Sequence, residues 1–142
     1  MNEFDGRVVS NFIIQSLKGE EITVYGDGSQ TRSFQYVHDL VDGLIALMNS
    51  DYSDPVNLGN PEEYTIQEFA TSIRDAVNPN AKIINLAAMA DDPQRRRPDI
   101  SVAKAEIGWQ PRFSVSQGIS DTVEYFRTVV KWETMVVPKR IQ

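Results

Sequence analysis

Cysteine is absent from this chain, and histidine occurs once, at His38. Without cysteine there can be no disulfide, no thiolate metal site and no cysteine nucleophile. A single histidine excludes a metal centre built from several histidines. Long apolar runs are also missing: Leu44–Met48 is far shorter than the roughly 20 residues that span a bilayer. We therefore expect no metal site and no membrane contact from this chain.

Positive charge is in the minority. The chain has 14 Lys and Arg against 20 Asp and Glu, which gives a net charge of -6 and a pI of about 4.7. This balance argues against nucleic acid as a partner. Hydrophobic residues make up 41% of the chain, enough for a buried core, and 142 residues are typical of one domain. We expect one unit, residues 1–142, in which any anion site is local.

The spacing of apolar residues predicts helices that alternate with short strands. Helices are expected at residues 7–18, Asp39–Met48, Thr65–Val77, Val102–Ile107 and Val115–Val130, and strands at Ile22–Tyr25, Arg32–Val37, Val56–Leu58 and Lys82–Leu86. This alternation favours an α/β or α+β arrangement over a helical bundle or a β-sandwich. The strands are too few for a complete doubly wound sheet.

Two helix starts carry polar residues. Thr65, with Glu68 three positions later, has the pattern of a capping box. Asp39 follows His38 directly, and the pair invites a general-base interpretation. Adjacent residues seldom face each other, however, so the sequence favours Asp39 as the N-cap of a helix.

A glycine-containing loop follows the first predicted strand. Gly26, Gly28, Gln30 and Arg32 offer backbone freedom, amide donors and a guanidinium, which suit a phosphate or a carboxylate. A surface hairpin with a solvated arginine explains the same pattern. The third glycine of a dinucleotide fingerprint is missing, so no dinucleotide role is assigned to the loop.

Three consecutive arginines lie in the segment DDPQRRRPDI, residues 91–100. Pro93 and Pro98 stiffen this segment, which would suit a diphosphate clamp. A solvated charge run balanced by neighbouring aspartates is an equal alternative. The residues themselves leave the choice open, and residues 91–98 are expected to form an exposed loop.

Several segments together resemble the UDP-glucuronic acid decarboxylases, a family of the extended short-chain dehydrogenase/reductase superfamily. They are GRVVSNFIIQSLKGEEITVYGDGSQTRSFQYVHDLVDGL, PVNLGNPEEYTIQEFA, DDPQRRRPDI and GWQP, in this order over nearly the whole chain. The Gln-Thr-Arg-Ser-Phe segment is shared across the superfamily, whereas the second and third segments are similar to the decarboxylases in particular. The resemblance implies the C-terminal part of an NAD(P)-binding, Rossmann-like α/β fold, without its N-terminal Rossmann half.

The resemblance also implies a chemistry. Family members hold NAD, oxidise UDP-glucuronate at C4 of the sugar, release CO2 from the 4-keto intermediate and return the hydride to give UDP-xylose. This chain has neither the glycine-rich NAD fingerprint nor the Tyr-x-x-x-Lys pair of the family. We therefore expect it to supply UDP-sugar binding, to be inactive alone and not to bind NAD by itself.

The family's site residues transfer by position. Arg32 matches the arginine at the diphosphate and reacting sugar, where it stabilises charge, and Arg96 matches the arginine that grips the UDP phosphates. Arg95 and Arg97 are expected to be solvated. The segment along the uracil corresponds to Ile22, Thr23, Val24 and Tyr25, with Gln15 as a weaker candidate for the same pocket. Arg7 matches an arginine beside the nucleotide and sugar that could reach the cofactor.

Three functions remain open at this point. The first is the sugar-binding region of a decarboxylase, with UDP-glucuronate, UDP-xylose or UDP as ligand. The second is a non-catalytic UDP-sugar-binding or regulatory module that pairs with a full-length subunit. The third is a fragment of a related nucleotide-sugar epimerase or dehydratase. The family suggests the cytoplasm or the Golgi lumen as the compartment.

Overall fold

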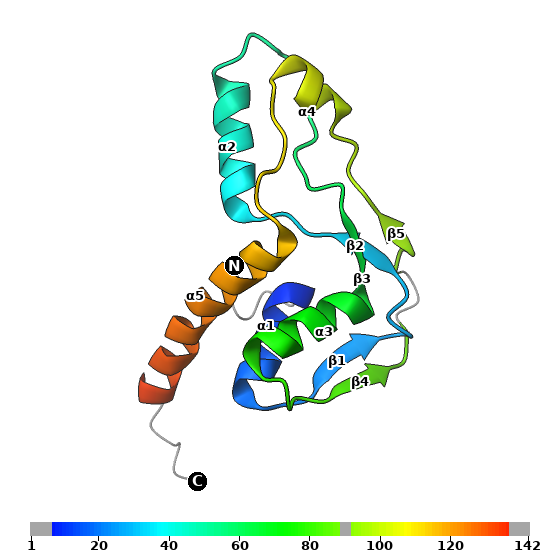
Figure 1. Ribbon diagram of the computed structural model, residues 1–142, viewed down its shortest axis with the longest axis vertical. Coiled ribbons are helices and arrows are strands. Elements are labelled where there is room, and N and C mark those ends of the chain that lie inside the picture. Colours follow the sequence, from blue (N-terminus) through cyan, green and yellow to red (C-terminus); the bar gives the residue numbers. More distant parts are fainter. Residues whose placement is uncertain (1–6, 89–91, 137–142) are drawn as a thin grey trace.

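The computed structural model describes residues 7–88 and 92–136, which form two lobes joined by a narrow waist (Figure 1). The lower lobe holds helices α1 (Val8–Lys18), α3 (Ile66–Val77) and α5 (Val115–Val136) around a parallel strand pair. The upper lobe holds α2 (Val37–Met48), α4 (Ser101–Glu106) and the chain segments beside them. The predicted mixture of helices and strands is confirmed.

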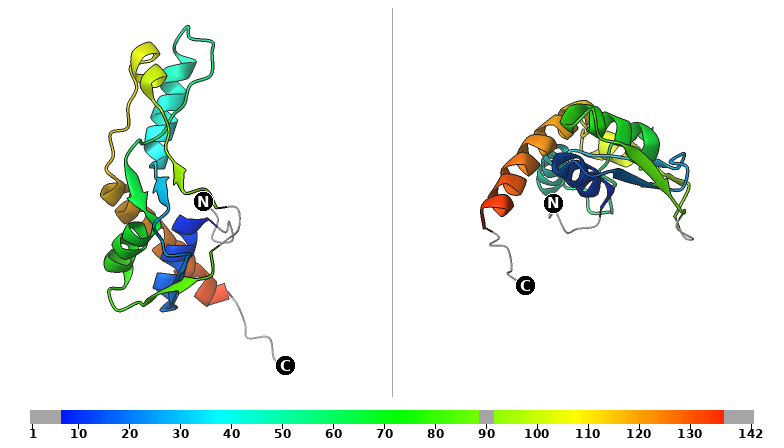
Figure 2. Two further views of the ribbon diagram at one scale, coloured as in Figure 1. Left: turned by 90° about the vertical axis from the view of Figure 1, so that its right-hand side faces the viewer. Right: turned by 90° about the horizontal axis from the view of Figure 1, so that it is seen from below.

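The lower lobe is built on β1 (Ile22–Tyr25) and β4 (Ile83–Leu86), which pair in parallel. Helices α1 and α3 contact each other and both contact β1, while α5 crosses them on the outside (Figure 2). Apolar residues at helical spacing meet in one core because each helix turns its apolar face inward. The largest fully buried side chains of this core are Phe69, Phe126, Ile13, Ile22, Ile73 and Val24.

Helix α3 begins with the predicted capping box. The backbone N–H of Glu68 donates to Thr65 Oγ1 at 3.1 Å, and the Thr65 N–H donates to Glu68 Oε2 at 2.9 Å. These bonds satisfy backbone donors that have no partner within the helix. The cap fixes the start of the helix directly after β3 (Glu63–Thr65).

A second sheet of three short strands lies at the waist, in the order β3–β2–β5. Strand β2 (Thr31–Ser33) is antiparallel to β3 and parallel to β5 (Arg95–Arg96). The predicted strand Arg32–Val37 is therefore shorter, since α2 begins at Val37. The prediction of an exposed loop over 91–98 was wrong at β5, because Arg95 and Arg96 form a strand by pairing with β2, which is distant in sequence. Asp91 lies outside the described residues.

The upper lobe has a small apolar cluster of its own. Ile100, Ala103 and Trp109 are buried there, with Val56 and Leu58 packed against them. A Cβ at Gly43 would lie 2.8 Å from the Leu58 side chain. The close contact between α2 and this cluster therefore requires a residue without a side chain at this position. The predicted strand Val56–Leu58 was wrong, because no strand within the described residues pairs with it.

Asp39 is not the N-cap of α2, as the sequence suggested. Tyr36 holds that position and makes no capping bond with its side chain. Asp39 lies in the first turn and is 1% exposed. Its carboxylate accepts the backbone N–H groups of Arg112 at 2.8 Å and of Phe113 at 3.2 Å. The aspartate thus holds the segment that leads into α5 against α2, a contact over more than seventy positions that local patterns do not reveal.

Candidate functional site

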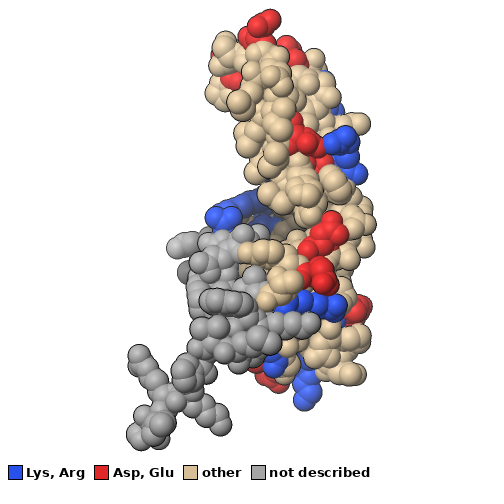
Figure 3. All heavy atoms as spheres, turned by 90° about the vertical axis from the view of Figure 1, so that its left-hand side faces the viewer, with Lys and Arg blue, Asp and Glu red and all other residues tan. Residues whose placement is uncertain are grey.

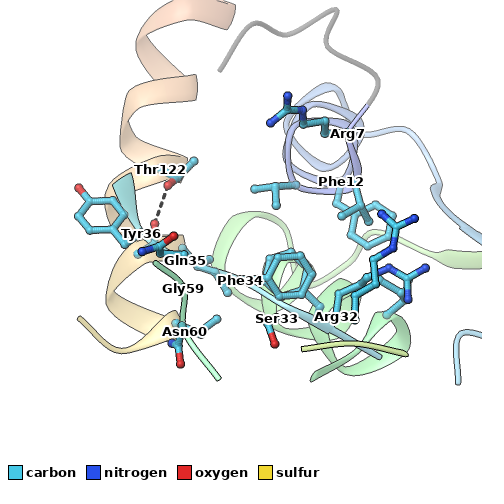
Figure 4. Close-up of a pocket in the computed structure, with 18 of the residues that line it drawn as sticks. Arg7, Phe12, Arg32, Ser33, Phe34, Gln35, Tyr36, Gly59, Asn60 and Thr122 are labelled. Carbon is cyan, nitrogen blue, oxygen red and sulfur yellow. Dashed lines mark hydrogen bonds between the residues drawn. The ribbon is translucent and has the colours of Figure 1, made fainter. Parts of the chain in front are cut away.

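A wide pocket of about 1450 Å³ opens between the two lobes. Its walls come from the start of α1, from β2 and the residues after it, from β5 and from α5. Figure 4 shows Arg7 and Phe12 on one side of the open space, Tyr36 and Thr122 on the other, and Arg32 at its edge. Polar and charged groups from distant parts of the sequence therefore face one space.

The sequence singled out eight site residues, and the pocket brings five of them together: Arg7, Thr23, Tyr25, Arg32 and Arg96. The side chains of Ile22 and Val24 are fully buried in the core of the lower lobe. These two residues can offer a ligand only backbone atoms. Gln15 does not line the pocket.

Arg32 and Arg96 lie side by side at the pocket edge. They are register partners across the parallel pair β2–β5, so both side chains leave the sheet on the same face. Arg32 donates through Nη1 to the Thr31 carbonyl at 2.7 Å and through Nη2 to Asp92 Oδ1. Within residues 7–88 and 92–136, the Arg96 side chain makes no hydrogen bond or ion pair. Its guanidinium is available to an anion.

The other two arginines of the run also line the pocket, but Glu63 pairs with both of them. Arg95 binds Glu63 with two contacts, Nε to Oε1 at 2.7 Å and Nη2 to Oε2 at 2.6 Å. Arg97 approaches the same carboxylate at 3.8 Å. The hydrogen bond from Arg95 holds the pKa of Glu63 below its usual range. The side chains of Arg95 and Arg97 are 65% and 52% exposed, so both remain in contact with solvent while they pair with Glu63.

Two glutamines bind the edge of β1 that faces away from β4. Gln15 accepts the Thr23 N–H through Oε1 at 3.1 Å and donates through Nε2 to Thr23 Oγ1 at 2.9 Å. Gln30 donates through Nε2 to the Tyr25 carbonyl at 2.9 Å. The Tyr25 ring is 46% exposed and lines the pocket, so a flat ligand could stack on it.

Sequence reasoning missed Tyr36, which lines the wall formed with α5. Its ring makes edge contacts with Phe113 at 5.0 Å and with His38 at 4.9 Å between centroids. Burial, with a smaller contribution from Asp121, raises the pKa of Tyr36, so the phenol stays protonated at neutral pH. Nothing in the local pattern distinguishes this tyrosine from the other four, because its environment is made by distant segments.

The glycine loop after β1 does not have the geometry of a dinucleotide-binding turn. The glycine loop after β1 leads into β2, whereas a dinucleotide pyrophosphate is bound where a strand turns into a helix N-terminus. In the described part of the chain, no three acidic or histidine side chains gather as metal ligands. No helix there is sufficiently long and apolar to cross a membrane.

Comparison with known proteins gives the family. The model of a family described as GDP-mannose 4,6 dehydratase matches residues 1–122. UDP-glucuronic acid decarboxylase 1 of Danio rerio is 59% identical over 126 residues, which are 89% of this chain and 30% of that protein. A decarboxylase of the same name from Arabidopsis thaliana is 51% identical over 87% of this chain and 28% of its own. The chain thus spans less than a third of these relatives, and it matches their C-terminal part.

Solved structures show the same fold. UDP-glucose 4-epimerase of Thermotoga maritima, determined with UDP-glucose, superposes with a TM-score of 0.86 at 26% identity, over 91% of this chain and 42% of its own. UDP-glucuronic acid 4-epimerase of Bacillus cereus, determined with a UDP-sugar and NAD, gives 0.81 at 24% identity over 87% and 40%. The chain is thus α/β with the fold of part of the extended short-chain epimerases and dehydratases, as the sequence predicted.

Proposed function

Because this chain belongs to the GDP-mannose 4,6-dehydratase family, we propose that it forms the UDP-sugar-binding part of a UDP-glucuronate decarboxylase. The observation that carries the proposal is the pair Arg32 and Arg96, two guanidinium groups on one face at the edge of the pocket. A nucleotide diphosphate needs such a pair, because guanidinium forks bind phosphate oxygens in bidentate fashion.

Each part of a UDP-sugar has a proposed partner. Arg32 and Arg96 bind the diphosphate, and Arg32 also stabilises charge near the sugar. The uracil lies along β1, with the Tyr25 ring beside it. Arg7, which lies at the N-cap of α1 and lines the same pocket, is placed on the sugar or cofactor side. Gln15 acts through Thr23, whose hydroxyl and N–H it holds.

The decarboxylation itself needs groups that this sequence lacks. NAD supplies hydride acceptance and return in such enzymes, and neither its glycine-rich fingerprint nor a Tyr-x-x-x-Lys pair occurs in the 142 residues. We therefore propose that the chain binds UDP-glucuronate, UDP-xylose or UDP and turns over only with an NAD-binding part.

Nuclear magnetic resonance of a reaction mixture tests this proposal. The chain, incubated with UDP-glucuronate and NAD, should give no UDP-xylose, while a full-length decarboxylase used as control should give it. Calorimetry with UDP should detect binding to the same sample. Product from the chain alone would contradict the assignment of roles, and absence of UDP binding by a folded sample would contradict the binding function.

Both this function and the regulatory alternative require a second protein part, and α2 offers a surface for it. Its apolar residues recur at the spacing of one helical face, yet they are 38–83% exposed: Val37, Leu40, Val41, Leu44, Ile45 and Met48. The opposite face carries the buried Asp39 and Gly43. Figure 3 shows the upper lobe from this side as largely uncharged, with acidic side chains at its top and both acidic and basic side chains along its margin. An exposed apolar face of this kind marks an interaction site.

An unpaired extended segment follows α2. Residues 53–59 make no backbone hydrogen bond with any described residue, although Val56 and Leu58 face the upper-lobe cluster as alternate residues of a strand do. A parallel sheet of another protein part would match both features. The extended segment could pair with the edge strand of that sheet, and the apolar face of α2 could pack against its surface. The proposed occupant is the NAD-binding part of a full-length subunit, since the relatives have more than twice the length matched here.

The regulatory alternative is a module that pairs with a complete subunit and does not complete a catalytic site. Co-purification with a full-length decarboxylase whose turnover is unchanged or lowered would favour it. A fragment of an epimerase or dehydratase is the third candidate, and a complete enzyme carrying this region that releases no CO2 would favour that one. The cytoplasm and the Golgi lumen remain family-based proposals for the compartment.

A further inference from the structure

A buried glutamine and an aspartate connect the base side of the pocket with the phosphate side. Gln30 is 8% exposed, and its Nε2 donates both to the Tyr25 carbonyl at 2.9 Å and to Asp92 Oδ2 at 3.2 Å. The other carboxylate oxygen of Asp92 accepts from Arg32 Nη2. One continuous network therefore runs from the end of β1 to the guanidinium of Arg32, across about sixty positions of sequence.

We propose that Asp92 is a positioning residue for Arg32 and that Gln30 holds it in place. This inference rests on the proposed UDP-sugar site and adds residues to it that no motif indicates. Asp92 does not itself touch the ligand in this account. It fixes the arginine that does.

The physical reason is the conformational freedom of arginine. A long side chain that binds an anion loses rotamer freedom at that moment, which weakens binding. Arg32 is already held at two N–H groups, by the Thr31 carbonyl and by Asp92, and its side chain is only 16% exposed. The guanidinium has five N–H donors, so donors remain for a phosphate. Most of the ordering therefore occurs on folding.

The negative charge of Asp92 acts in the opposite direction, because it repels a diphosphate. The Asp92 side chain is 36% exposed, however, so water and salt screen its charge. Screening also weakens the ion pair with Arg32, but the direct hydrogen bond still fixes the direction of the guanidinium. Positioning is therefore expected to outweigh repulsion.

Arg96 provides the internal contrast. It has the same charge and lies on the same face, but no described side chain holds it. Loss of Asp92 should therefore affect the contribution of Arg32 and leave that of Arg96 unchanged. This difference separates positioning from a general effect on charge or folding.

A double-mutant cycle tests the inference, with UDP as the probe and calorimetry as the readout. Asp92→Asn should weaken UDP binding by about 3- to 10-fold without lowering the thermal unfolding midpoint. The same change in an Arg32→Ala background should have no further effect, whereas in an Arg96→Ala background it should keep its full effect. Asp54→Asn, at an exposed position that does not line the pocket, controls for net charge.

Tighter or unchanged UDP binding by Asp92→Asn would overturn the inference, and so would a loss that persists in the Arg32→Ala background. A second measurement does not depend on UDP binding. It is 15N NMR relaxation of the Arg32 Nε–H group in the absence of ligand, which reports the mobility of the side chain directly. In the wild type Arg32 should be ordered, and in Asp92→Asn it should be mobile. A wild-type Arg32 as mobile as the exposed Arg127 would overturn the inference even if UDP did not bind.

Discussion

Arg32 of β2 and Arg96 of β5 are register partners across a parallel strand pair, with their side chains on the same face. Two like charges held side by side repel each other, and a bound diphosphate relieves that repulsion. The run of three arginines is thus divided: its middle member joins Arg32, while Arg95 and Arg97 are directed to Glu63. The middle arginine and its two neighbours therefore have different partners within the described residues, although all three line the pocket.

Loss of either pocket arginine should weaken nucleotide binding. Arg32→Ala and Arg96→Ala are each expected to lower UDP affinity by about 1.5–3 kcal/mol, the range for a hydrogen bond to a charged group, or roughly 10- to 150-fold. Calorimetry measures the change. Arg127→Ala, at an exposed arginine that does not line the pocket, is the matched control and should leave UDP affinity within about twofold. Unchanged affinity in both pocket variants would refute the placement of the diphosphate.

Stability should fall in acid because of Glu63. Its pKa is lowered in the folded chain, first by the hydrogen bond from Arg95, so the folded state binds a proton there less readily than the unfolded state. The contribution is present above the ordinary glutamate pKa of about 4.3 and is lost as the pH falls through the lowered value. Thermal unfolding between pH 7 and pH 3 should show a smaller pH dependence for Glu63→Gln than for the wild type. Superimposable pH profiles would contradict this.

Asp39 should matter to stability although no sequence pattern marks its contacts. In Asp39→Ala the backbone N–H groups of Arg112 and Phe113 lose their acceptor. We expect the free energy of unfolding to fall by about 1–3 kcal/mol, because these donors are left without a hydrogen bond. Urea unfolding measures it. Asp51→Ala, at an exposed aspartate just beyond α2, should stay within about 0.5 kcal/mol. Equal effects of the two changes would show that the buried contacts contribute little.

The exposed apolar face of α2 should be needed for binding to the NAD-binding part of a decarboxylase, but not for folding of this chain. Leu44→Asp changes a side chain that is 47% exposed, so the unfolding midpoint should remain near that of the wild type. Binding to a co-expressed NAD-binding part of a decarboxylase, followed by size-exclusion chromatography with light scattering, should be lost. Val102→Asp, on α4 and 38% exposed, is the control that should still bind. Retained binding by Leu44→Asp would exclude this face, and self-association of the wild type through it would identify a second copy as the occupant.

Capping residues and apolar patterns within a short stretch of sequence predicted the helices and strands whose formation depends on neighbouring residues. Helix α3 has its capping box and its inward apolar face, and β1 and β4 have compact apolar runs, so their existence followed from the sequence. Strand β5 did not, because two arginines become a strand only beside β2. Asp39 was misassigned for the same reason, since its partners lie about seventy residues away.

The site shows the same division. Arg32 and Arg96 were indicated by a resemblance of sequence segments, and the fold explains why they can act together. Gln30, Asp92 and Tyr36 acquire their surroundings only through the tertiary structure. The α2 pattern predicted a helix correctly, but periodicity alone does not say whether an apolar face is covered by the same chain or by another one.

Saturation-transfer difference NMR with UDP-glucuronate tests the central claim most directly, namely that this chain alone recognises a UDP-sugar. The account predicts saturation of the uracil H5 and H6 protons and of the sugar anomeric proton by the wild-type chain. It also predicts loss of these signals in the double variant Arg32→Ala/Arg96→Ala, with Arg127→Ala, remote from the pocket lining, behaving as the wild type. A folded wild-type chain that transfers no saturation to the uracil would contradict it.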